Sequence, residues 1–245
     1  MNHCIIVGAQ RSGSTYLFKL LEEHPEVCVS QPSKPEPKYF LHLDQNLNKD
    51  EYLNKYFSNC EKGKRIYLEK STSYYESKEA ASNINRILPQ AKILFVLRDP
   101  VERALSNYFF SLNNGLETRS LKEVFLDNIP PPKYNRSEIS VNPFDYLGRG
   151  EYLNYIKTYL DYFSRENVKV VILEELLDSV NTIQAIYSFL GIYKSYVPSN
   201  LNQKINMSQR NEEVIDVIKV QLKEYYKKHN FHLESLLHQT LTNWN

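Results

Sequence analysis

A short loop with a glycine at each end constrains the fold of this chain more than any other feature. Residues 8–15 read Gly-Ala-Gln-Arg-Ser-Gly-Ser-Thr, follow an apolar run at residues 4–7, and precede leucines at helical spacing. The chain has only seven glycines, so the closeness of Gly8 and Gly13 carries information. Glycine allows sharp turns and a close approach of the backbone to a ligand. The pattern therefore predicts a strand, an anion-binding turn and a helix whose N-terminus faces the anion.

The remaining sequence alternates between apolar runs typical of buried strands and segments with helical periodicity. The predicted strands are residues 4–7, 27–29, 66–68, 92–97 and 168–173. The predicted helices are residues 14–23, 50–57, 77–88, 151–163, 180–190, 212–228 and 233–241, with one more beginning at Pro100. Such alternation predicts an α/β fold, a three-layer sandwich in which helices flank a central parallel sheet, as in P-loop nucleotide kinases. We find no linker or repeat and expect one domain over residues 1–245.

Charge and cysteine content limit the partners that the chain is expected to have. Thirty Lys and Arg residues balance 29 Asp and Glu residues, which leaves a net charge of +1 and no global field for nucleic acid or an anionic membrane. No apolar stretch approaches the ~20 residues of a membrane span. The three cysteines are odd in number and lack CxxC spacing, so we expect a reduced, cytoplasmic protein. The six histidines are scattered, and no metal site is expected.

The first loop differs from the phosphate loop of nucleoside triphosphatases at one decisive position. That loop reads Gly-x4-Gly-Lys-Ser/Thr, whereas Ser14 stands here in place of the lysine, and Arg11 inside the loop supplies the cation. The change disfavours Mg-dependent triphosphate chemistry and favours a nucleotide whose 5′ end needs an arginine and hydroxyl donors. A tight turn that merely caps a helix is the alternative interpretation.

A second anion site is predicted where the strand at residues 92–97 ends. Arg98 follows that strand, and Asp99-Pro100 is a typical helix start, with Asp as N-cap and Pro at the first position. Arg98 can hold a phosphate with two hydrogen bonds, and Ser106 in the second turn of the helix can add a hydroxyl. The alternative is a capped helix with a surface ion pair.

Together the two motifs resemble those of sulfotransferases that use 3′-phosphoadenosine 5′-phosphosulfate (PAPS). Residues 10–15 resemble the family's 5′-phosphosulfate loop, and residues 98–108 resemble its 3′-phosphate motif, in which the equivalents of Arg98 and Ser106 hold the phosphate. The resemblance assigns the 5′-phosphosulfate to Arg11, Ser12, Gly13, Ser14 and Thr15. Many family members have Lys where this chain has Arg11. Arg210 lies where the family has a loop over the nucleotide, and the resemblance places it near the 3′-phosphate.

Two further segments resemble the heparan-type branch of that family and its bacterial relatives. Glu36-Pro37-Lys38-Tyr39-Phe40 resembles a stretch whose Glu is the general base, and Glu69-Lys70-Ser71-Thr72 resembles one whose Lys reaches the reaction centre. The implied catalytic residues are Glu36, Lys70 and Arg11. Sulfuryl transfer needs a base for the acceptor proton and cations for the charge on the leaving phosphate. The alternatives are a solvated Glu36, a Lys70 paired with Glu69, and His24 or His42 at the site.

The balanced charge also bears on the acceptor. A polyanionic acceptor would require an extended basic surface, so we expect a small molecule, with guanidinium alkaloids as one class that acidic residues could recognise. The acidic candidates are Glu36, Asp44, Asp145 and Glu151. Two other functions stay open: a P-loop kinase of nucleotides or small molecules, with Asp99 as its Mg²⁺ ligand, and a nucleotide-binding module without catalysis. PAPS, leaving as 3′,5′-adenosine diphosphate, is the expected cofactor; the oligomeric state is not predicted.

Overall fold

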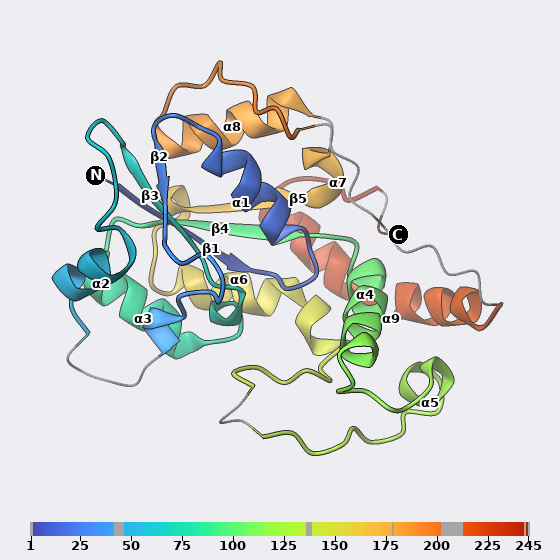
Figure 1. The fold of residues 1–245 in the computed structure, drawn as a ribbon. Helices are drawn as coiled ribbons and strands as arrows, with labels where there is room; N and C mark the ends of the chain where they lie inside the picture. The colour runs from blue at the N-terminus through green and yellow to red at the C-terminus, as the bar shows by residue number, and fades with distance from the viewer. Residues whose placement is uncertain are drawn as a thin grey trace. The chain divides into compact units, whose positions relative to one another are not determined.

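The computed structural model describes residues 2–41, 47–135, 139–177, 179–201, 213–242 and 244 (Figure 1). These residues form two compact units, Met1–Arg98 with Tyr155–Gln203, and Asp99–Asn154 with Lys204–Asn245. Each unit contains a hydrophobic core cluster of its own. The expected single domain over residues 1–245 stays a prediction.

The first unit is built on a five-stranded sheet in the order β2-β3-β1-β4-β5. The strands are β1 (Asn2–Gly8), β2 (Val27–Val29), β3 (Ile66–Lys70), β4 (Lys92–Leu97) and β5 (Val168–Ile172). All four pairings are parallel, which confirms the predicted sheet. Parallel strands place their carboxyl ends at one edge, where α/β proteins bind ligands. The segments that follow the strands are therefore neighbours there.

Helices cover both faces of this sheet, which confirms the predicted three layers (Figure 1). The α-helices of the first unit are α1 (Ser14–Glu22), α2 (Lys49–Tyr56), α3 (Lys78–Ile87), α7 (Leu173–Leu176), α8 (Val180–Leu190) and most of α6 (Tyr152–Leu160). Helices α1 and α8 pack on alternate strand residues such as Cys4, Ile6 and Leu94. Helices α3 and α6 lie on the opposite face, where Tyr159 contacts the ring of Phe95. Short 3₁₀ turns complete the unit: η1 (Tyr39–Leu41), η2 (Thr72–Tyr74) and η4 (Arg165–Asn167).

The second unit is helical and corrects one prediction. It contains α4 (Pro100–Asn113), α5 (Leu121–Phe125), η3 (Gly148–Gly150) and α9 (Glu213–Leu237). Two C-terminal helices were predicted, over residues 212–228 and 233–241, but α9 runs through the predicted break. No glycine or proline interrupts it, so nothing local ends the helix earlier. Helix α5 was not predicted, although Ser120 and Glu123 form the capping box that marks its start.

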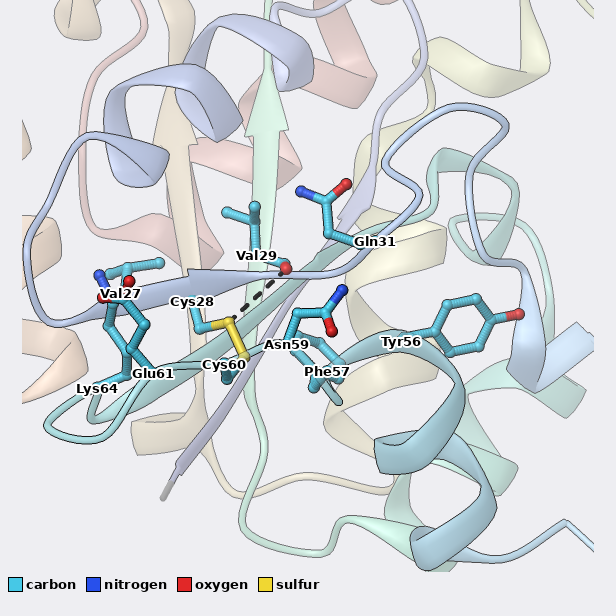
Figure 2. Close-up of a pocket in the computed structure, with 10 residues that line it drawn as sticks. All are labelled: Val27, Cys28, Val29, Gln31, Tyr56, Phe57, Asn59, Cys60, Glu61 and Lys64. Atoms are coloured by element: carbon cyan, nitrogen blue, oxygen red, sulfur yellow. Dashed lines mark hydrogen bonds between the residues drawn. A yellow bond between two sulfur atoms is a disulfide. The ribbon is translucent and has the colours of Figure 1, made fainter.

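The cysteines also differ from the prediction, since Cys28 and Cys60 form a disulfide (Figure 2). Cys28 lies on β2 and Cys60 follows α2, so their separation of 32 positions hides the pairing in the sequence. Only the packing of α2 beside the sheet edge brings the two Cα atoms to 5.9 Å. Cys4 is a free, buried thiol. The expectation that all three cysteines are reduced is therefore wrong.

The disulfide predicts the number of free thiols in the purified protein. Under denaturing conditions without reductant, we expect a thiol reagent to label one cysteine per chain, which is Cys4, and three after reduction. The Cys28→Ser variant is the control, because it should show two thiols without reductant, Cys4 and the released Cys60. Three thiols in the unreduced wild type would contradict the pairing.

Candidate functional site

The loop between β1 and α1 has a backbone that only glycine can form at its two ends. Gly13 adopts φ 86° at the start of α1, and an added Cβ would lie 2.4 Å from a methyl carbon of Leu173. At Gly8 an added Cβ would lie 2.7 Å from the Cβ of Tyr75. The loop therefore packs closely against Leu173 at one end and Tyr75 at the other. Its turn leads directly into the first residue of α1. This geometry is the one in which backbone N–H groups converge on an anion.

The hydroxyl of Ser12 supports an anion site in this loop. Ser12 is fully buried, and its Oγ has no hydrogen-bond partner among the residues that the structure describes. A buried hydroxyl without a partner is unfavourable and rare. Phosphate or sulfate oxygens would satisfy it, so the loop fits the 5′-phosphosulfate of PAPS. Ser14 is also buried, whereas Thr15 at the start of α1 is exposed.

Two arginines approach each other at the ends of the neighbouring strands β1 and β4. The strands are held together there by the N–H of Ala9, which donates to the Val96 carbonyl at 2.9 Å. Partial burial and, next in size, the charge of Arg98 lower the pKa of Arg11. Like charges disfavour each other's charged form, and a bound anion beside them would offset that repulsion. This is the arrangement expected where the nucleotide's phosphates bind.

The other residues predicted for the 3′-phosphate belong to the second unit or lie outside the described residues. Ser106 is partly buried on α4 and belongs to the second unit, so its pairing with Arg98 stays a prediction. Arg210 lies outside the described residues. The motif residue Arg103 is fully buried in the second unit, where its guanidinium donates to the Tyr146 carbonyl and to Asn107. It therefore stabilises that core.

Glu36 and Lys70, two of the predicted catalytic residues, are in direct contact. The Lys70 ammonium donates to Oε1 of Glu36, although the two residues are 34 positions apart. Lys70 is only 8% exposed at the end of β3, and the Glu36 side chain is 17% exposed. Both alternative interpretations are therefore wrong: Glu36 is not a solvated loop carboxylate, and Lys70 does not pair with Glu69.

Thr72 fixes the other oxygen of the Glu36 carboxylate. Its backbone N–H donates to Oε2 at 2.8 Å, and its hydroxyl donates to the same oxygen at 3.0 Å. Thr72 belongs to the Glu69–Thr72 segment of the family resemblance, which implied no role for it. Its place two residues after Lys70 was the available signal, since Lys70 ends β3 and Thr72 follows closely. Glu36 is thus held from two sides by one strand end.

The Glu36–Lys70 pair lies next to the anion loop because β3 pairs with β1. Lys70 is in register with Ile6, two residues before Gly8, and the N–H of Ser71 donates to the Ile6 carbonyl at 3.2 Å. Tyr75, which follows η2, packs on Gly8. The Glu36 carboxylate, the Lys70 ammonium and the anion loop therefore lie together at the carboxyl ends of β1 and β3. Such a group can accept a proton, stabilise developing negative charge and bind a nucleotide.

Of the two histidine alternatives, His24 has a structural role in the described structure. His24 is fully buried, with Nε2 at 2.9 Å from the Tyr193 carbonyl and Nδ1 accepting from the N–H of Glu26 at 3.1 Å. Both ring nitrogens are used to join the end of α1 to the segment after α8, so His24 is structural. His42 lies outside the described residues. Among the described residues, no three His, Cys, Asp or Glu side chains are grouped to hold a metal ion.

A pocket of about 350 Å³ lies elsewhere, beside β2 and the disulfide (Figure 2). Its lining includes Val29, Gln31, Tyr56 and Lys64 together with Cys28 and Cys60. None of the residues predicted for nucleotide binding or catalysis lines it. In the described part of the chain, no helix is long and apolar enough to span a membrane.

Asp99 has the role of a helix cap, as the sequence predicted. Its Oδ1 accepts the backbone N–H groups of Val101 at 2.8 Å and Glu102 at 3.4 Å. This use of the carboxylate satisfies the first turn of α4. The kinase interpretation, which needed Asp99 as a Mg²⁺ ligand, is weakened accordingly.

Comparison with known proteins identifies the family. The family model of the sulfotransferase domain matches residues 1–240. The human bifunctional heparan sulfate N-deacetylase/N-sulfotransferase 3 is 24% identical over 270 residues, 98% of this chain and 30% of the relative. Mouse heparan sulfate glucosamine 3-O-sulfotransferase 3B1 is 26% identical over 190 residues, 77% of this chain and 45% of that protein. The chain thus spans less than half the length of these relatives.

Solved structures of sulfotransferases have the same fold as this chain. A sulfotransferase from Alicyclobacillus acidocaldarius matches with a TM-score of 0.76 and 26% identity over 100% of this chain and 98% of that one. The sulfotransferase domain of the curacin biosynthetic pathway shares the fold, with a TM-score of 0.52 and 12% identity, over 90% of this chain and 97% of that one. The predicted fold is confirmed. Because the family model covers nearly the whole sequence, the chain belongs to the sulfotransferase family.

Proposed function

We propose that this chain transfers the sulfuryl group of PAPS to a hydroxyl or nitrogen of a small-molecule acceptor. The observation that carries the proposal is the contact between Glu36 and Lys70 beside the anion loop. A nucleotide-binding module without catalysis would need the loop and the arginines, but it would not need a half-buried carboxylate held against an ammonium. The pair therefore favours an enzyme.

The residues around the loop fit the nucleotide. The backbone of residues 11–15, with the orphaned hydroxyl of Ser12, would hold the 5′-phosphosulfate, and Arg11 would neutralise its charge. Arg98 would bind the 3′-phosphate. The sequence motif assigns Ser106 and Arg210 to that same phosphate, and these two assignments stay predictions. When bound, PAPS supplies the sulfuryl group and leaves as 3′,5′-adenosine diphosphate.

The pair of side chains suits an in-line displacement at sulfur. Glu36 would take the proton of the acceptor hydroxyl or amine, with Thr72 keeping the carboxylate in place. Lys70 and Arg11 would offset the negative charge that develops on the oxygen leaving with the phosphate. Every proton and charge in this scheme is handled by side chains of the chain, so the scheme requires no metal ion.

The net charge and the acidic residues of the chain bear on the acceptor. The net charge of +1 favours a small acceptor over a polyanion, although the curated relatives are heparan sulfate enzymes by name. Of the acidic residues considered for a cationic guanidinium acceptor, Asp145 caps Gly148, and Glu151 accepts from Tyr225. Both are therefore engaged within the second unit, and Asp44 lies outside the described residues. Glu36 is engaged in the same way, with Lys70 and Thr72, so no described acidic candidate favours a guanidinium acceptor over another small molecule.

The cellular location is also a proposal. A cytoplasmic enzyme was expected from the sequence, but the Cys28–Cys60 disulfide favours a compartment that is less reducing. The thiol count described above therefore bears on location as well as on structure.

Nucleotide preference tests the proposed function directly. We expect isothermal titration calorimetry to show tighter binding of 3′,5′-adenosine diphosphate than of ATP with Mg²⁺, because Ser14 replaces the lysine of the triphosphate loop. Radiolabelled PAPS is then incubated with a panel of a phenol, an amino-sugar oligosaccharide and guanidinium compounds. A preference for Mg-ATP would contradict the proposal in favour of a kinase. Tight diphosphate binding without transfer to any acceptor would favour the non-catalytic module.

A further inference from the structure

Glu69 is a fully buried carboxylate next to Lys70 that the proposed chemistry does not use. Its Oε2 accepts the Tyr52 hydroxyl at 2.6 Å, and its Oε1 accepts the Ser71 hydroxyl at 2.7 Å. Burial raises the pKa of Glu69, and its hydroxyl donors oppose that rise. A carboxyl group in a core is costly unless its hydrogen bonds are satisfied. The bond to Ser71 links it to the segment that carries Glu36.

Ser71 joins Glu69 to the Glu36 segment through its single hydroxyl. The hydroxyl proton goes to Glu69, so a lone pair of Oγ faces the backbone N–H of Lys38, which donates to it at 3.0 Å. Glu69, as an acceptor at this point, thus determines which way the hydroxyl of Ser71 points. The backbone of Ser71 is fixed independently, because its N–H donates to the Ile6 carbonyl of β1.

The Glu36 segment depends on such side chains for its position. Residues 31–38 contain three prolines and no strand or helix, so ladder hydrogen bonds do not hold them. The Tyr56 hydroxyl donates to the Pro37 carbonyl at 3.2 Å, and the Tyr74 hydroxyl accepts the N–H of Phe40 at 3.1 Å. Together with Ser71, these contacts fix the backbone from residue 37 to residue 40. Glu36 immediately precedes that stretch.

We propose that Ser71, with its hydroxyl oriented by the buried Glu69, is a positioning residue that holds the Glu36 segment so that the carboxylate meets Lys70 and Thr72. The inference rests on the catalytic role proposed for Glu36. It explains why a carboxylate lies in the core beside the reacting group. Small displacements of a catalytic group are costly, since an error of about 1 Å can lower a rate ~100-fold.

The test compares three variants of the full chain, Ser71→Ala, Ser71→Thr and Tyr52→Phe. Ser71→Ala removes the link, and Ser71→Thr keeps a hydroxyl at the same place. Tyr52→Phe is the matched control, because it removes another hydroxyl bonded to the same carboxylate and keeps the ring that packs on Tyr39 and Phe40. Hydrogen exchange of a peptide covering residues 36–41 reports on the segment and needs no acceptor. A peptide from α1 serves as the internal reference.

We expect Ser71→Ala to speed exchange in residues 36–41 and to lower kcat about tenfold with the best acceptor of the panel. The Kd for 3′,5′-adenosine diphosphate should stay within about twofold, because residues 11–15 and Arg98 are intact. Ser71→Thr should restore both readouts to within about threefold. Tyr52→Phe should lower the Tm without faster exchange in residues 36–41. Unchanged exchange in Ser71→Ala, or equal changes in Tyr52→Phe, would overturn the proposal.

A parallel Glu36→Gln variant separates the positioning role proposed for Ser71 from the catalytic role proposed for Glu36. If Glu36→Gln is inactive while Ser71→Ala behaves as wild type, only the positioning role of Ser71 fails. If Glu36→Gln keeps its activity, the role proposed for Glu36 fails whatever Ser71 does. The exchange measurement still decides whether Ser71 holds the segment when no acceptor of the panel is turned over.

Discussion

The Glu36→Gln variant is expected to lose about 10²–10³-fold in kcat while keeping its affinity for 3′,5′-adenosine diphosphate. Glutamine has nearly the size of glutamate, and its amide oxygen can still accept from Thr72. It cannot take a proton from an acceptor at neutral pH, so turnover should fall while the nucleotide site is unaffected. Steady-state rates with labelled PAPS and calorimetry with the diphosphate give the two quantities.

Glu61→Gln is the matched control for this experiment. Glu61 is exposed and lies beside the disulfide pocket, so the same chemical change there should leave kcat within about twofold. Full activity in Glu36→Gln would show that another group is the base. A parallel loss of nucleotide affinity and Tm would show that the variant disturbs the fold, because Lys70 would then be a buried ammonium without its carboxylate.

Replacing Arg98 with alanine should weaken the binding of 3′,5′-adenosine diphosphate more than tenfold. Arg98 follows β4, is partly buried, and its charge acts on Arg11. A guanidinium in such a place can form two charge-assisted hydrogen bonds to a phosphate, and alanine forms none. Calorimetry at two salt concentrations measures the loss, and the variant should show a weaker salt dependence because one cation fewer faces the anion.

The control for Arg98 lies at the opposite end of the sheet. Arg65 immediately precedes β3 at the amino ends of the strands, has a side chain 60% exposed, and pairs with Glu26. Arg65→Ala should change diphosphate affinity by less than about twofold, since an exposed ion pair contributes little. Equal affinity in Arg98→Ala and the wild type would show that the second anion motif is only a capped helix. A loss in Arg65→Ala as large as in Arg98→Ala would indicate a nonspecific charge effect.

The predictions that succeeded depend on neighbours in the chain. Strand β4 was found from its apolar run, helix α4 from the Asp99-Pro100 start, and the turn at residues 8–15 from two glycines five residues apart. The prediction of two separate helices in place of α9 was wrong. No proline or glycine lies within Glu213–Leu237, so the helix continues through the predicted break. Such signals are local, so they describe elements better than they describe contacts between elements.

The contacts that make the site arise from long-range packing. The sequence by itself determined the parallel α/β sheet, the turn at residues 8–15 and the residue types of the Glu36 and Lys70 segments. Only the tertiary structure decided that Lys70 pairs with Glu36 rather than Glu69, and that Cys28 meets Cys60. The physical reason is tertiary packing: the register of β3 beside β1 places Lys70 next to the anion loop, and the packing of α2 beside β2 places Cys60 next to Cys28. Strand register is set by the whole buried face of the sheet, and no short motif encodes it.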